Sequence, residues 1–205
     1  MRTWTGLLLS LAMFLAAETA LAAPAAGPRG AVEAAVDRFM TIVQNGQAGA
    51  TASAERTAEI REIVRDMFDF DEISKRALSR HWQTLQTDEQ AEFVPLFRDL
   101  LERAYLAQVE SVGGERIVFL GESIDAGGSA TVRSKVLTRH GTEIPLDYRM
   151  HVIGGTWRIY DVIVQGISFI ASYRTQFDRV IRAESYSSLR DRLRQKATET
   201  TAAQR

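Results

Sequence analysis

The polar side chains that could perform chemistry are few and scattered along this 205-residue chain. Tyr160 and Asp161 form the one polar pair within a segment that is otherwise apolar and strand-like. Asp161 could act as a catalytic acid. The simpler interpretation is a buried phenol or carboxylate bonded to neighbouring backbone. Ser168 follows Gly166 in a helix-start pattern, without an adjacent histidine or acid to activate it.

The histidines and the sequence motifs give no further support for an enzyme. His81, His140 and His151 lie far apart and share no metal-ligand spacing. His140 adjoins a turn glycine and His151 falls on a polar strand face, so we expect both to be exposed. The sequence contains no nucleophile elbow, phosphate-binding loop or dinucleotide fingerprint. We therefore expect a protein that is not an enzyme and needs no cofactor.

The acidic segment Asp69-Phe70-Asp71-Glu72 offers a metal site as one alternative. Its carboxylates could supply oxygen ligands, but the spacing of a calcium-binding hand is absent. The favoured interpretation is structural, because a carboxylate accepts hydrogen bonds from the free amides at a helix start. We expect Asp71 to cap a helix over 73–82, and we expect no metal.

Composition and the N-terminus indicate an exported protein. Residues 1–22 combine Arg2, an apolar stretch over 6–17 and the small-x-small site Ala20-Leu21-Ala22, the pattern of a cleaved signal peptide. The chain has no cysteine, which excludes disulfides, thiol catalysis and cysteine-based metal sites. Its formal net charge of −1 gives no electrostatic reason to bind nucleic acid. We expect a soluble protein of the bacterial periplasm.

Hydrophobic periodicity divides the remaining chain into helices, then strands, then helices. After a flexible leader over 23–30 we expect a single domain over 31–196 and a polar tail over 197–205. The expected helices cover 31–45, 53–67, 73–82 and 88–112, with a cap at Thr87 and a kink or break at Pro95. The expected strands cover 115–122, 130–139, 143–153 and 156–164, followed by helices over 167–183 and 186–195.

These elements predict an α+β fold, in which a curved four-stranded antiparallel sheet is covered by N-terminal and C-terminal helices around an apolar cavity. Glycines between the strands are typical of tight hairpin turns. A sheet with one apolar face needs a cover, which the flanking helices can supply. Gly166 suits the sharp corner at which the last strand turns into a helix.

Several segments resemble the MlaC (toluene-tolerance) family of periplasmic phospholipid carriers. The most specific is Trp157-Arg158-Ile159-Tyr160-Asp161-Val162 followed by Gly166-Ile167-Ser168. Phe70-Asp71, the run over 87–105, and Tyr173-Arg174 with Phe177 also fit. The resemblance covers residues 30–195, nearly the whole mature chain.

The resemblance implies a shuttle that carries phospholipid between membranes and maintains the lipid asymmetry of the outer membrane. Its implied partners are the lipid-binding subunit of an inner-membrane ABC transporter and an outer-membrane lipoprotein–porin complex. A hopanoid carrier of the same family is an alternative. Two further alternatives are a periplasmic interaction domain with a filled core and an enzyme that uses Tyr160, Asp161 or a histidine.

We expect the lipid-binding residues to lie on the concave sheet face and on two covering helices. This assignment assumes strands without bulges, because a slip of one residue exchanges the two faces. The candidate residues are Phe97, Leu101, Tyr105, Val132, Val136, Leu146, Tyr148, Met150, Trp157, Ile159, Ile163, Ile167, Ile170 and Tyr173.

Overall fold

The computed structural model of the chain describes residues 26–44, 50–110 and 115–203. The expected signal peptide, 1–22, lies outside these residues. The described helices are α1 (Pro28–Gln44), α2 (Ala50–Met67), α3 (Phe70–Leu78), the 3-10 helix η1 (Ser79–Thr84), α4 (Thr87–Glu110), α5 (Phe169–Ala183) and α6 (Tyr186–Ala203). The strands are β1 (Arg116–Ile124), β2 (Ala130–Leu137), β3 (Glu143–Ile153), β4 (Thr156–Val164) and β5 (Ile167–Ser168).

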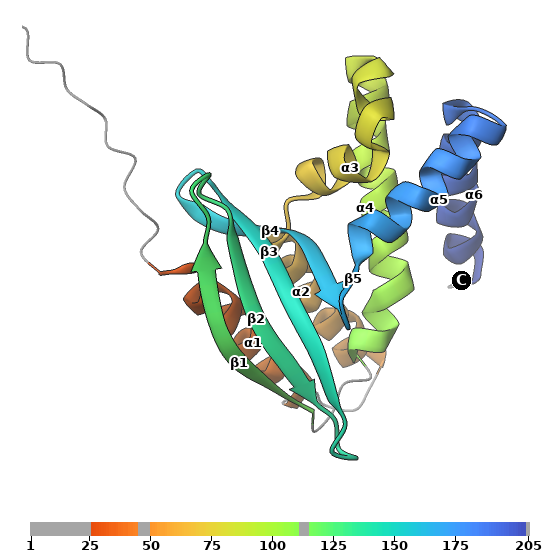
Figure 1. Ribbon diagram of the computed structural model, residues 1–205. Helices are drawn as coiled ribbons and strands as arrows, with labels where there is room; N and C mark the ends of the chain where they lie inside the picture. The colour runs from red at the N-terminus through yellow and green to blue at the C-terminus, as the bar shows by residue number, and fades with distance from the viewer. Residues whose placement is uncertain (1–25, 45–49, 111–114, 204–205) are drawn as a thin grey trace, which may run out of the picture.

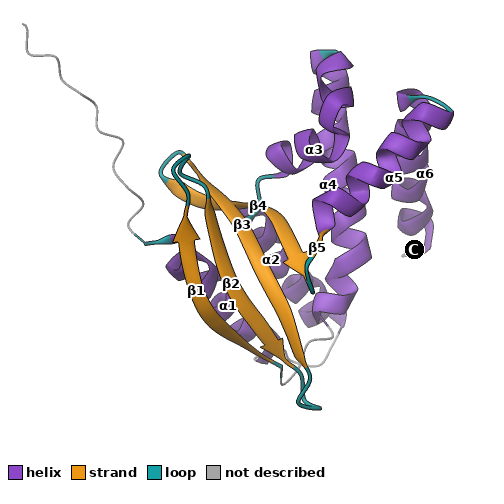
Figure 2. Cartoon of the chain, in the orientation of Figure 1, coloured by secondary structure: helices purple, strands orange, loops and turns teal. Residues whose placement is uncertain are grey.

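The sheet is an antiparallel meander in the order β1-β2-β3-β4-β5 (Figure 2). The predicted fold class and the four long strands are therefore confirmed, and β5 adds a two-residue strand. Gly154 and Gly155 both take positive φ at the β3–β4 turn, the geometry that two-residue hairpins need. Gly166, with φ of 81°, forms the predicted corner after β4.

Two irregularities bend this sheet. Leu120 is the extra residue of β1, because Phe119 pairs with Ser134 and Gly121 with Arg133. Tyr160 is the extra residue of β4, because the pairing moves from Asp161 to Ile159 between consecutive residues of β3. A bulge increases local twist and reverses which residues face each side beyond it.

Helices α1 and α2 lie behind the inner face of the sheet, while α3–α6 gather beside its β4 edge (Figure 1). We call the α3–α6 group the helix bundle. Its core is a cluster of buried residues, the bundle core: Ile73, Ala77, Leu78, Phe93, Phe97, Ile170, Phe177, Leu189 and Leu193. A second cluster, the sheet core, joins α1 to the sheet: Val32, Ala130, Val132, Tyr148, Met150, Trp157 and Ile159.

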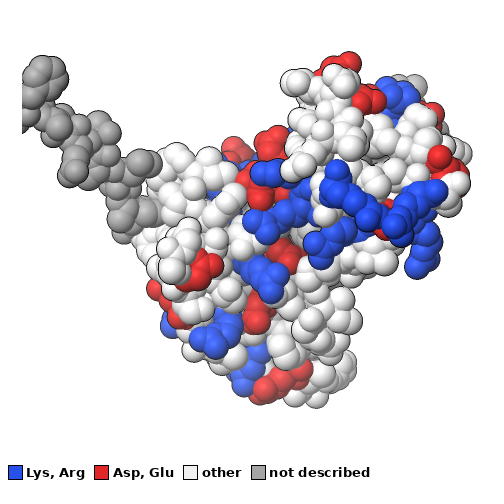
Figure 3. All heavy atoms as spheres, turned by 45° about the horizontal axis from the view of Figure 1, so that its top comes forward, with Lys and Arg blue, Asp and Glu red and all other residues white. Residues whose placement is uncertain are grey.

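The outer face of the sheet carries charges of both signs (Figure 3). Lys135 forms an ion pair there with Glu143, and Arg149 lies 3.6 Å from the buried carboxylate of Asp161. The division of β2 and β3 into an apolar inner face and a polar outer face agrees with the sequence prediction.

Several helix ends differ from the predictions. Helix α1 begins at Pro28, inside the expected leader, because proline's fixed φ suits a first helical position. Helix α4 begins after Gln86, whose amide donates to the Glu89 carboxylate at 3.0 Å, so the expected cap at Thr87 is displaced by one residue. The helix continues through Pro95 without a break.

Helix α6 extends to Ala203, well past the end expected at 195, so most of the predicted polar tail is helical. Among the described residues, no helix combines the length and the apolar composition that crossing a membrane requires.

Candidate functional site

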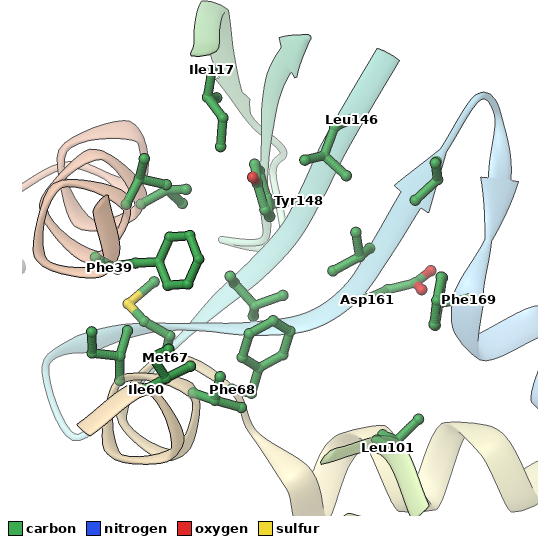
Figure 4. Close-up of a pocket in the computed structure, with 18 of the residues that line it drawn as sticks. Phe39, Ile60, Met67, Phe68, Leu101, Ile117, Leu146, Tyr148, Asp161 and Phe169 are labelled. Atoms are coloured by element: carbon green, nitrogen blue, oxygen red, sulfur yellow. The ribbon is translucent and has the colours of Figure 1, made fainter. Parts of the chain in front are cut away.

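A cavity of about 480 Å³ lies between the inner face of the sheet and helices α1 and α2. Side chains from α1, α2 and strands β1–β4 converge on it, with Leu101 of α4 at its edge (Figure 4). Its lining comprises Val32, Ala35, Val36, Phe39, Met40, Ile60, Arg61, Ile63, Val64, Met67, Phe68, Phe70, Ile73, Leu101, Glu102, Glu115, Ile117, Val136, Leu146, Tyr148, Ile159, Asp161, Val162, Val164, Phe169 and Ile170.

The lining is almost entirely apolar. Its charged members are Arg61, Glu102, Glu115 and Asp161. Tyr148 adds a phenol, and burial raises the pKa of that phenol to about 12, against a smaller lowering effect of its hydrogen bond with Ser134. The phenol therefore stays neutral at physiological pH, and the cavity offers an environment suited to hydrocarbon.

Six of the predicted residues line this cavity: Leu101, Val136, Leu146, Tyr148, Ile159 and Ile170. They come from both the sheet and the covering helices. Leu146 and Tyr148 point inward from β3, facing Phe39 and Met67 across the space in Figure 4.

The structure places the other predicted residues elsewhere. Val132, Met150 and Trp157 are packed in the sheet core. Phe97 belongs to the bundle core, and Tyr173 packs against its ring with the centroids 5.1 Å apart. The side chain of Tyr105 lies outside the described part of the structure.

Ile163 and Ile167 are kept from the cavity by the geometry of the sheet edge. The Tyr160 bulge places Ile163 opposite Asp147 on the outer face and turns Val162 and Val164 to the cavity instead. Ile167 belongs to β5 rather than to a helix, and the residue is 65% exposed.

Sequence reasoning missed the contribution of the two N-terminal helices. Val36, Phe39 and Met40 of α1 face Ile63 and Met67 of α2 within the lining. The helical spacing of these residues gave a usable signal, because it marks an apolar face on each helix. The spacing alone did not show that the sheet, rather than the other helices, is the partner of that face.

Asp161 has a structural role at the junction of β4 and α5. Its side chain is 5% exposed, and its carboxylate accepts hydrogen bonds from the Ser168 hydroxyl at 2.7 Å and the Ile170 amide at 3.2 Å. Ser168 in turn caps α5 by accepting from the Ala171 amide. Two side chains thereby satisfy the free amides of the first turn and fix the direction in which α5 leaves the sheet.

Asp69 caps α3 in place of the predicted Asp71. One carboxylate oxygen accepts from the Glu72 amide at 3.0 Å, and the other lies 2.8 Å from Nε2 of His151. The expectation of an exposed His151 is therefore wrong, because its ring contacts Asp69 and Tyr160 and its side chain is only 25% exposed. These contacts hold the α2–α3 connection, including Phe68 and Phe70 of the lining, against the sheet.

A smaller pocket of about 280 Å³ adjoins the cavity between α2 and α4. We call it the arginine pocket. It is lined by Arg61, Arg65, Arg98, Asp99, Glu102 and Arg103, of which Arg61 and Glu102 also line the cavity. An apolar space thus meets a predominantly basic one at a shared boundary.

Comparisons with known proteins agree with this architecture. The family model described as MlaC protein matches residues 33–195. A curated relative, the toluene tolerance protein Ttg2D of Pseudomonas putida, is 29% identical over 119 residues, which is 58% of this chain. That match spans only about half, 55%, of the length of the relative.

Among solved structures, the phospholipid-binding protein from Ralstonia solanacearum, determined in complex with a phospholipid, has a TM-score of 0.72 and 22% sequence identity. The match covers 85% of this chain and 98% of that one. At this identity the likeness establishes the shared fold. The match to the family model, which extends over most of the chain, shows that the protein belongs to the MlaC family.

Proposed function

We propose that this protein is a periplasmic lipid carrier whose cavity encloses the acyl chains of a phospholipid. The observation that carries the proposal is the cavity itself, a space of about 480 Å³ with an almost wholly apolar lining. Pockets that hold small ligands measure about 300–1,000 Å³. The phospholipid complex of the Ralstonia solanacearum protein, which has the same fold, supports this choice of ligand.

The energetics of lipid transfer suit such a cavity. Each methylene moved from water to an apolar site contributes about 0.8 kcal/mol, so the roughly thirty methylenes of a diacyl lipid contribute on the order of 20 kcal/mol. A bilayer offers nearly the same stabilisation. A carrier therefore needs an interior that matches the membrane, so that lipid can enter and leave without crossing water.

Family membership supports the wider role that we propose. The carrier, exported by the signal peptide over 1–22, receives or delivers lipid at an inner-membrane ABC transporter and an outer-membrane lipoprotein–porin complex. Such exchange maintains the lipid asymmetry of the outer membrane. The proposal includes no catalytic step, and the hydrogen bonds of Asp161 serve the start of α5.

Native mass spectrometry of protein purified gently from the periplasm tests the proposal. We expect mass adducts of phospholipid that disappear on denaturation, with lipid extraction identifying their head groups. If the extracted lipid is a hopanoid, the protein is a hopanoid carrier rather than a phospholipid carrier. Ligand-free protein from a periplasm rich in both lipids would contradict carriage.

A further inference from the structure

The arginine pocket carries more positive charge than its own acids neutralise. Arg61, Arg65, Arg98 and Arg103 face only Asp99 and Glu102, which leaves a formal excess of two positive charges. The i, i+4 spacing of Arg61 and Arg65 places both on one face of α2, opposite the α4 residues. Two arginines from each helix therefore converge across one gap.

The ion pairs within this pocket leave guanidinium donors available. Arg61 Nε lies 3.4 Å from a Glu102 oxygen and Arg103 lies 3.6 Å from Asp99. Arg98 lies 3.7 Å from Asp99 and 3.8 Å from Glu102. Charge-assisted hydrogen bonds measure about 2.7–2.9 Å, so these contacts are loose. The buried Arg61 Nε has no hydrogen-bond partner among the described residues.

The free donors are unevenly distributed among the four arginines. Arg103 donates to the carbonyl oxygens of Lys196 and Ala197 at 2.8 and 2.7 Å, which ties α4 to α6. The guanidinium of Arg65, by contrast, forms no ion pair with any residue of the described chain and is exposed. Arg98 has two acidic neighbours, but these contacts, at 3.7 and 3.8 Å, are the longest ion pairs in the pocket. Arg65 and Arg98 are therefore the arginines with the most capacity for an added anion.

We propose that the arginine pocket binds the phosphate group of a lipid whose acyl chains occupy the cavity. This inference rests on the proposed carrier function. The apolar lining excludes a phosphate, so the phosphate must stay at a boundary of the cavity. Arg61 and Glu102 form such a boundary, and guanidinium groups match phosphate oxygens in bidentate geometry.

The test compares two lipids that differ in the phosphate alone. Lipid-stripped protein is offered an equimolar mixture of dioleoyl phosphatidic acid and dioleoylglycerol from detergent micelles, and native mass spectrometry gives the ratio bound. The variant Arg65→Gln/Arg98→Gln removes two charges from the pocket. The control Arg174→Gln/Arg179→Gln removes two charges from exposed positions of α5 that do not line the pocket.

We expect the pocket variant to lower the ratio of phosphatidic acid to dioleoylglycerol by about tenfold or more, because it removes charge-assisted hydrogen bonds to the phosphate. The control should keep the wild-type ratio. Circular dichroism of both variants checks that the fold is retained. An unchanged ratio in the folded pocket variant would overturn the inference.

A second arm titrates inorganic phosphate into the lipid-stripped protein. Phosphate binding that the pocket variant loses, together with an unchanged lipid ratio, would assign the pocket to a free anion and overturn the lipid assignment. Failure of the wild-type protein to take up either lipid would overturn the carrier function together with this inference. The two failures are therefore distinguishable.

Discussion

The helix bundle and the sheet region are both built on apolar side chains, but among the described residues the large apolar cavity lies in the sheet region. In the bundle, Phe93, Phe97 and Phe177 form ring contacts with centroids 5.0–5.8 Å apart, and Phe93 and Phe97 are fully buried. Aromatic rings that meet edge to face fill space efficiently and add stability beyond their buried area.

In the sheet region, the residues of α1 and α2 face the strands across a space that they do not fill. The sheet core closes one part of this region, with Val132 and Met150 fully buried, while Leu146 and Ile117 border the cavity. In the described residues, the bundle is densely packed, whereas the curved sheet and helices α1 and α2 leave an apolar space unfilled.

We expect the largest loss of stability from a substitution in the bundle core. Phe97→Ala removes a fully buried ring from a packed cluster and should lower the free energy of unfolding by about 3–5 kcal/mol, measured by urea denaturation. The lipid bound per folded molecule should not change, because Phe97 does not line the cavity. A loss of less than about 1.5 kcal/mol would show that the bundle is not densely packed there.

Filling the cavity should reduce lipid binding and leave stability nearly unchanged, the opposite of the result expected for Phe97→Ala. Leu146→Trp places a larger ring in the space beneath β3 and should remove most of the bound lipid, while stability changes by less than about 1.5 kcal/mol. Lipid content is measured by native mass spectrometry. The matched control, Ile163→Trp, adds the same bulk on the outer face of the sheet. Equal lipid contents in the two variants would contradict the assignment of the cavity as the binding site.

The junction between the two regions can be weakened without touching either core. Asp161→Asn removes the negative charge of the carboxylate. That charge strengthens the hydrogen bond from Ser168, and it attracts the Arg149 guanidinium, which lies 3.6 Å away. We expect a loss of about 1–3 kcal/mol in unfolding free energy. Ser168→Ala, which removes the cap alone, should cost about 1 kcal/mol. An Asp161→Asn protein with wild-type stability would refute the structural role of the carboxylate.

The smallest effect concerns a surface contact of the bundle. The hydrogen bond from His81, with further contributions from Arg80 and Arg182, lowers the pKa of Asp178 despite some desolvation. A lowered folded-state pKa gives stability that is present at neutral pH and lost as pH falls through that pKa. Asp178→Asn should therefore slightly reduce the melting temperature at neutral pH, and the difference from wild type should shrink below about pH 4. A difference in melting temperature that grows as pH falls would contradict a lowered pKa of Asp178.

Much of the fold could be predicted from the sequence, because strands 130–139 and 143–153 alternate regularly and are followed by glycine turns. Helix boundaries were harder to predict. Pro28 lies in a segment whose proline and glycine content suggests a loop, yet proline is favourable at a first helical position. The helix caps at Gln86 and Asp69 each lie one or two residues before the predicted cap. The polar residues at both positions can form the capping hydrogen bond equally well, so the sequence alone did not distinguish them.

The cavity lining was harder to predict than the fold because it depends on contacts between distant elements. The assignment of Ile163 followed strict alternation along β4, and the extra residue Tyr160 reverses that alternation. An apolar stripe looks the same whether it packs against side chains, as at Phe97, or borders an empty space, as at Phe39. The sequence therefore identified apolar faces without distinguishing a filled core from a cavity.

The central claim, that lipid chains occupy the cavity rather than any other apolar surface, is tested most directly by photo-crosslinking. A phospholipid with a photoactivatable diazirine in one acyl chain is loaded, irradiated and mapped by peptide mass spectrometry. The account predicts adducts on cavity residues such as Phe39, Met67 and Leu146. Adducts confined to the exposed apolar residues Leu120 and Ile124 of β1, with none in the cavity, would contradict it.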